Sequence, residues 1–129
     1  MKEVRTVPKG DYEIVKARFV ECRRSIAACL WLKGTKKCKL MLAAAGRGEF
    51  DVSKDRRTLL YRDVSPPGLS KSERLGVFLW SLCARGFKGT SLDTGDISCL
   101  EGLKLSLRTI PTERDRWGRP CVVVTKLLA

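Results

Sequence analysis

The sequence predicts a single α+β domain in which an antiparallel sheet packs against one main apolar helix, at about residues 71–85. Three observations point to this class. One segment carries a helix-start signal followed by an apolar body, several short segments have the patterning of strands, and the chain has the length of one domain, 129 residues. We expect this domain to span residues 1–129, with residues 1–10 flexible.

The first strand is expected over residues 12–20, which are rich in β-branched and aromatic side chains. An apolar run over 25–32 then leads to a plausible turn at Lys33-Gly34-Thr35. The next segment, 39–45, is compatible with a strand or with a short helix, because its three consecutive alanines favour a helix that Gly46 would end.

Residues 50–52 and 58–64 flank a polar stretch and predict a hairpin. The helix follows. Ser70 and Glu73 have the spacing of a capping box, in which both side chains satisfy free backbone N–H groups. The body is apolar on nearly all sides as far as Cys83, which places it in the core or at an interface.

Beyond the helix, apolar and polar side chains alternate from Leu103 to Thr109, which predicts a strand with one apolar and one basic face. Pro111 is expected to end it. A charged turn over 114–120 and an apolar strand over 121–125 complete the sheet.

Positive charge dominates the composition: 26 Lys and Arg oppose 14 Asp and Glu, a formal net charge of +12. Small soluble domains typically carry a net charge of about 2 to 8 in magnitude, so the excess indicates an anionic partner. It is concentrated in residues 33–62 and 104–126, chiefly at expected turns. We expect a non-enzymatic protein that binds nucleic acid, RNA rather than DNA, through Arg- and Lys-rich turns.

The candidate contacts share a position in or beside these turns. Trp117 is included because an indole among arginines can stack on an unpaired base, although it can equally anchor the turn against the sheet. The candidate residues are Lys33, Lys36, Lys37, Lys39, Lys54, Arg56, Arg57, Arg62, Arg114, Arg116, Trp117 and Arg119.

Residues 89–103 have the opposite charge balance, with three acidic side chains and no basic one. These residues can simply shape a tight loop, or they can dock on the basic face of a second copy. The candidates for self-association are Asp93, Asp96, Glu101 and, on the apolar helix, Trp80.

Several kinds of chemistry lack their usual residues. The chain has no histidine, its six cysteines form no C-x-x-C pair, and Gly46-Arg47-Gly48 lacks the spacing of a phosphate-binding loop. We therefore expect no enzymatic activity, no cofactor and no metal. The charged start and the lack of a long apolar run predict an intracellular location, cytoplasmic or nuclear.

The order of elements resembles that of the matrix proteins of negative-strand RNA viruses, of the rhabdovirus type. An extended segment at 11–20, an apolar helix at 75–84, an acidic loop and an alternating strand at 102–110 carry the resemblance. It implies a self-assembling structural protein of a virion that binds ribonucleoprotein and an anionic membrane. A third alternative, based on charge alone, is an accessory protein that binds an acidic partner protein.

Overall fold

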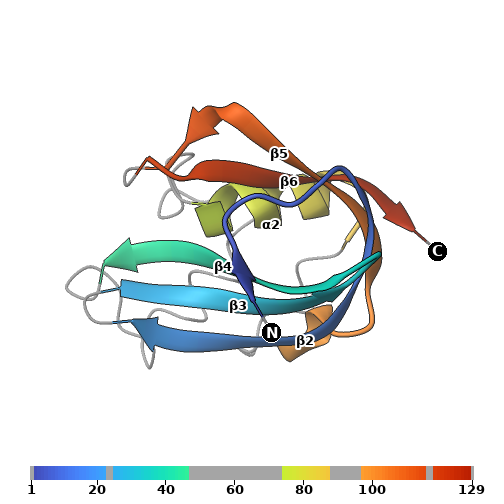
Figure 1. Cartoon of the computed structure of the whole chain (residues 1–129), viewed down its shortest axis with the longest axis horizontal. Coiled ribbons are helices and arrows are strands. Elements are labelled where there is room, and N and C mark those ends of the chain that lie inside the picture. Colours follow the sequence, from blue (N-terminus) through green and yellow to red (C-terminus); the bar gives the residue numbers. More distant parts are fainter. Residues whose placement is uncertain (1, 23–24, 47–73, 88–96, 116–117, 129) are drawn as a thin grey trace.

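The computed structural model describes residues 2–22, 25–46, 74–87, 97–115 and 118–128. Its sheet has six strands in the order β1-β4-β3-β2-β5-β6 (Figure 1). The elements are β1 (Glu3–Val4), β2 (Gly10–Cys22), β3 (Ser25–Lys33), β4 (Lys37–Gly46), α2 (Arg74–Ala84), a short 3-10 helix η2 (Ser98–Leu100), β5 (Lys104–Arg114) and β6 (Pro120–Leu128).

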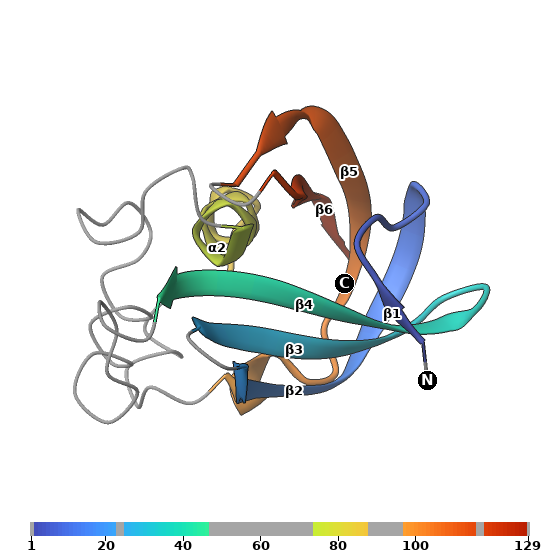
Figure 2. The ribbon, with the colours of Figure 1, turned by 60° about the vertical axis from the view of Figure 1, so that its left-hand side comes forward.

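The sheet is mixed rather than wholly antiparallel, which corrects the sequence-based expectation. β1 runs parallel to β4, and every other neighbouring pair is antiparallel. β2, β3 and β4 follow one another along the chain, and β5 returns after a long connection to lie beside β2, which makes a Greek key. The sheet is strongly curled, so that its two ends approach each other (Figures 1 and 2).

The helix occupies a different place from the one expected. It contacts β6 and β4, which belong to the two ends of the curled sheet, instead of covering one face of a flat sheet. Figure 2 shows α2 nearly end-on between β4 and the β5–β6 pair. The Ser81 hydroxyl attaches it to β6, accepting the Val124 N–H at 2.8 Å. The domain is therefore α+β in the broad sense, with strands predominating.

One apolar core fills the space inside the curl. The helix supplies Phe78, Leu79 and Leu82, all fully buried, and the strands supply most of the other fully buried side chains. Burial of such side chains is the main force that holds helix and sheet together. The largest strand contributions are Ile14, Leu30, Leu32, Leu40, Leu42, Leu105, Leu107, Val122 and Val124.

The helix ends at Ala84, and the chain turns away from it at Gly86. Gly86 has a φ of +109°, a left-handed conformation that glycine adopts without steric cost. The Gly86 N–H donates to the Cys83 carbonyl and the Phe87 N–H to the Leu82 carbonyl, which is the Schellman pattern. The capping box at Ser70 and Glu73 lies outside the described residues.

Arg74, at the start of the helix, is 1% exposed and connects three segments of the chain. Its guanidinium donates to the carbonyls of Pro120 in β6 at 2.8 Å, Met41 in β4 at 2.7 Å and Arg5 at 2.6 Å. In the described sheet β6 pairs with β5 alone, so these bonds close the seam between the sheet's ends. Burial lowers the pKa of Arg74, but an arginine stays charged in proteins.

Residues 2–10, which belong to the segment for which the sequence predicts flexibility, contribute to the sheet and the core. β1 pairs with β4, and the Lys39 N–H donates to the Lys2 carbonyl at 2.9 Å. Val7 is 3% exposed, and its N–H donates to the Thr109 hydroxyl at 2.8 Å. This segment therefore pairs with the edge of β4 and is hydrogen-bonded to β5.

The structure decides between the two alternatives for residues 39–45 and corrects the expected end of a strand at Pro111. Residues 39–45 lie in β4, because pairing with β3 overrides the helical preference of the alanines. β5 passes through Pro111 and ends at Arg114. The register between β5 and β6 shifts between Ile110 and Arg114, so Pro111 lies where no regular ladder bond is required.

The hairpin expected over 50–52 and 58–64 lies outside the described residues. None of the described helices has the length and apolar composition that a bilayer crossing needs.

Candidate nucleic-acid interface

The outer surface of β2, β3 and β4 is the candidate site. Along β3 the side chains of Leu30 and Leu32 point into the core, so Trp31 between them points outward. In β4 the side chains of Leu40 and Leu42 are buried, so the alternation of a strand places Lys39 on the outer surface.

A β-bulge brings part of β2 onto the same surface. Ile14 pairs with Leu32 and Lys16 pairs with Trp31, so Val15 is an extra residue and is 52% exposed. Such an insertion reverses the faces of all residues that follow it along the strand. Lys16 and Arg18, which have the same parity as the buried Ile14, therefore point outward.

Cross-strand pairing arranges these outward residues in rows. Trp31 lies between Lys16 in β2 and Lys39 in β4. Because neighbouring strands are about 4.8 Å apart, a cation stands on each side of the indole. Adjacent rows add Arg18 on one side and the Lys33–Lys37 pair on the other. We call this surface the basic sheet face, made of Lys16, Arg18, Trp31, Lys33, Lys37 and Lys39.

Lys16 and Trp31 also contact each other directly. The Lys16 ammonium lies over the Trp31 ring, 5.0 Å from its centroid. This distance is within the range of a cation–π interaction, which holds the half-buried indole in place. A base that stacked on this side of the ring would displace the ammonium and free it for a phosphate.

Two carboxylates border the basic sheet face. Glu13 pairs with Lys33 on one side and with Lys104 on the other, and Glu3 pairs with Lys39. Among the described residues, the five cations of the face therefore outnumber the carboxylates at its margins. The cross-strand neighbours described for the central row of Lys16, Trp31 and Lys39 include one carboxylate, Glu3 of β1.

The sequence-predicted candidates fall in two places. Lys33, Lys36 and Lys37 lie at the β3–β4 turn, and Lys39 follows in β4. Arg114 and Arg119 flank the β5–β6 turn, which lies on the opposite side of the molecule (Figures 1 and 2). The structure thus does not bring the two turns into one described surface. Lys54, Arg56, Arg57, Arg62, Arg116 and Trp117 lie outside the described residues.

The β5–β6 turn is held by its own polar contacts. The Arg114 guanidinium donates to the Gly118 carbonyl at 2.7 Å, and the Arg119 N–H donates to the Asp115 carboxylate at 2.8 Å. Asp115 is 6% exposed, so it stabilises the turn from within. Arg114 is exposed and its side chain serves this turn in the described structure.

The candidates for self-association have different environments. Asp93 and Asp96 lie outside the described residues. The Glu101 carboxylate accepts the Ala17 N–H at 2.9 Å, next to the bulge in β2, so it has a local structural role. Trp80 is 51% exposed on a helix whose other large side chains are buried.

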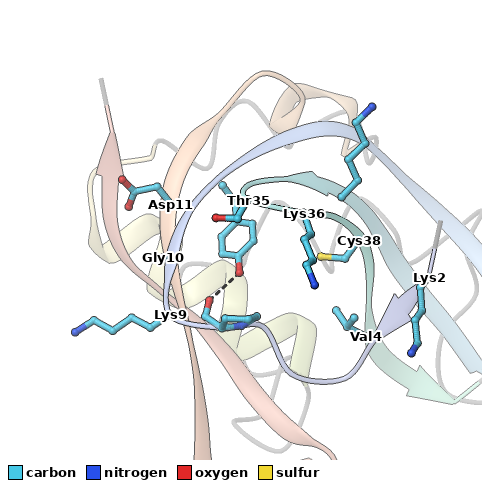
Figure 3. A pocket seen from close by; sticks show the side chains of 11 residues that line it. Lys2, Val4, Lys9, Gly10, Asp11, Thr35, Lys36 and Cys38 are labelled. Atoms are coloured by element: carbon cyan, nitrogen blue, oxygen red, sulfur yellow. Dashed lines mark hydrogen bonds between the residues drawn. The ribbon is translucent and has the colours of Figure 1, made fainter.

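A pocket of about 590 Å³ opens between the N-terminal segment and the β3–β4 turn, beside the basic sheet face (Figure 3). Its lining includes Lys2, Lys9, Lys36 and Lys37, together with apolar groups. The Tyr12 hydroxyl donates to the Pro8 carbonyl at 2.8 Å and holds one wall in place (Figure 3). The described residues contain no group of three His, Cys, Asp or Glu side chains placed to hold a metal ion.

Gly34 supports the Tyr12 wall of this pocket. A Cβ at residue 34 would lie 2.7 Å from the Tyr12 Cδ1 atom and 3.0 Å from the Asp11 carbonyl oxygen. Gly34→Ala should therefore lower the free energy of unfolding by about 1 to 3 kcal/mol, the usual cost of overpacking. Urea denaturation measures this. Gly10→Ala is the matched control, since a Cβ there meets nothing within 4 Å. Equal stability of the two variants would contradict the close approach.

Sequence reasoning missed Lys16, Arg18 and Trp31. Trp31 stood within an apolar run, and strict alternation assigns Lys16 and Arg18 to the face of Ile14. A partial signal was present in Lys37-Cys38-Lys39-Leu40, where basic and apolar side chains alternate and mark one basic face of that strand.

Comparison of the chain with models of known families, with curated proteins and with solved structures finds no match.

Proposed function

We propose that the protein binds single-stranded nucleic acid on the basic sheet face, with Trp31 as the stacking platform. The observation that carries this proposal is the row Lys16–Trp31–Lys39, in which an indole lies between two cations. Proteins that bind single strands combine these two elements, an aromatic ring for a base and positive charge for the backbone. A strand crossing the row would place a base on Trp31 and its neighbouring phosphates near the lysines.

The architecture supports the choice of this surface. The Greek key of β2 to β5, together with β6, forms a curled sheet of five long strands. In the described sheet β4 and β6 do not pair with each other across the seam that Arg74 bridges. This plan is similar to that of OB domains, small partly open Greek-key barrels that bind oligonucleotides or oligosaccharides on one sheet face. The analogy is one of architecture alone, so the proposal depends on the residues of the face.

Removal of the indole tests the proposal. In fluorescence anisotropy with labelled ten-nucleotide single strands, Trp31→Ala should weaken binding by roughly 5- to 150-fold, because stacking contributes about 1 to 3 kcal/mol per base. Trp31→Phe should retain most of the affinity. Trp80→Ala is the matched control, since it removes a half-exposed indole from another surface. Equal binding by wild type and Trp31→Ala would exclude stacking on this residue.

Two comparisons define the ligand. Oligo-U and oligo-dT of equal length test the preference for RNA, which requires tighter binding of oligo-U. Polyglutamate tests an acidic protein partner, because it carries charge but no base. The contrary result is that polyglutamate binds as tightly as oligo-U, with both affinities unchanged in Trp31→Ala. Charge alone would then explain the binding.

Self-assembly is a second proposal, favoured by the half-exposed indole of Trp80 on an otherwise buried helix. Sedimentation of the wild type should then show an oligomer that Trp80→Ala dissociates. A wild-type monomer at all concentrations would exclude self-assembly, and failure to float with anionic liposomes would exclude the matrix-like role.

A further inference from the structure

We propose that the pocket between the N-terminal segment and the β3–β4 turn is a separate binding site for a mononucleotide-sized phosphorylated ligand. Its volume of about 590 Å³ lies within the 300 to 1,000 Å³ typical of small-molecule sites. The pocket does not include Trp31, so this site is distinct from the stacking row. The inference therefore does not depend on the binding of single strands.

Cations provide the phosphate end of the site. The Lys36 side chain points toward the pocket, which Cys38 also lines (Figure 3). Lys2 lines the wall formed by the N-terminal segment. A phosphate between these walls would receive charge-assisted hydrogen bonds, which are among the strongest that proteins make.

No described carboxylate neutralises these cations from within the pocket. Asp11 is the acidic residue of the lining, but its side chain points away from Lys36 (Figure 3). Its Oδ1 atom accepts a hydrogen bond from the Ser106 hydroxyl at 2.6 Å. Burial raises the pKa values of the Tyr12 and Cys38 side chains, so both stay uncharged near neutral pH. The net charge of the pocket lining is therefore positive.

Apolar groups line the part of the pocket that would hold the ring of the ligand. Val4, Pro8 and the Tyr12 ring line the pocket, and an uncharged ring such as a base or sugar suits such a surface. The walls are fixed before binding. The Lys39–Lys2 backbone bond holds the N-terminal segment on β4, and the Tyr12 hydroxyl holds Pro8. A preformed site loses little conformational entropy on binding.

Calorimetric titration of the full chain with AMP and UMP tests the site. We expect saturable binding, weaker binding of adenosine, which lacks the phosphate, and weaker binding of inorganic phosphate, which lacks the ring. Lys36→Gln should weaken AMP binding about tenfold or more, the loss expected for a hydrogen bond to a charged group.

Lys9→Gln is the matched control, because Lys9 borders the same pocket but its side chain points away from it (Figure 3). This variant removes the same charge and should change AMP binding less than twofold. Equal losses in both variants would show that net charge attracts the nucleotide, and they would overturn the site.

Cys38 provides a direct readout of occupancy. Alkylation by iodoacetamide, followed at the Cys38 peptide by mass spectrometry, should slow when AMP is saturating. An unchanged rate at saturating AMP would place the nucleotide elsewhere. Trp31→Ala separates the two proposals: it should leave AMP binding intact, and loss of AMP binding in this variant would assign the nucleotide to the basic sheet face.

Discussion

Replacing Arg74 by methionine should lower the free energy of unfolding by about 3 to 5 kcal/mol. The side chain is almost fully buried and donates to the Pro120, Met41 and Arg5 carbonyls. Methionine fills a similar volume but has no donor, so three carbonyls that point at the seam lose their partner. A buried acceptor without a partner costs about 1 to 3 kcal/mol. The lower part of the summed range applies, because two of the three bonds are only partly buried.

Urea denaturation followed by circular dichroism measures this loss. Arg74→Lys keeps the charge but replaces the planar guanidinium with one ammonium, so its loss should be intermediate. It also provides a measurable variant if Arg74→Met does not fold. The control is Arg108→Met on the exposed side of β5, for which we expect a change within about 0.5 kcal/mol. An Arg74→Met protein as stable as this control would show that the seam does not need the guanidinium.

Neutralising the cations around Trp31 should weaken nucleic-acid binding by about 100-fold at 0.1 M salt. The variant is Lys16→Gln, Arg18→Gln and Lys39→Gln combined. Each phosphate contact with a single strand contributes about 0.7 to the slope of log K against log salt concentration. If the three side chains each contact a phosphate, the slope for the variant should be shallower by about 2. If wild type and variant bind equally at 1 M salt, this difference over the tenfold dilution to 0.1 M lowers log K of the variant by about 2.

A matched triple variant separates location from net charge. Arg85→Gln, Arg108→Gln and Lys126→Gln combined remove the same charge from exposed positions on other elements. This control should retain a slope within about 0.5 of wild type. Arg114→Gln with Arg119→Gln reports separately on the β5–β6 turn. If both triple variants lost the same affinity and slope, binding would follow the total charge, and the basic sheet face would have no special role.

The helix and three of the strands, β2, β5 and β6, were predictable because local patterns determine them. The apolar body before Gly86 predicted α2, and the β-branched residues of 12–20 predicted β2. The placement of the helix was not predictable in this way. It depends on how far the sheet curls and on contacts such as that of Arg74 with Met41, which join residues far apart in sequence.

The basic sheet face was predictable only in part. Lys33, Lys36, Lys37 and Lys39 form a visible cluster in the sequence, whereas Lys16 and Arg18 reach the same surface through the bulge at Val15. One inserted residue changes which face every later side chain occupies, and the sequence carries no clear mark of it. Pro111 is a similar case, since the irregular register between β5 and β6 accommodates it within the strand.

The seam at Arg74 also has a kinetic consequence. Its three hydrogen bonds join residues separated by 33, 46 and 69 positions, so they require the N-terminal segment, β4, α2 and β6 to be in place at once. Because closing long loops costs entropy, we expect contacts of such high sequence separation to form late, after the hairpins that bring their partners together. Interactions absent from the folding transition state act mainly on the unfolding rate. Arg74 thus governs how long the folded domain persists once formed, more than how quickly the chain reaches it.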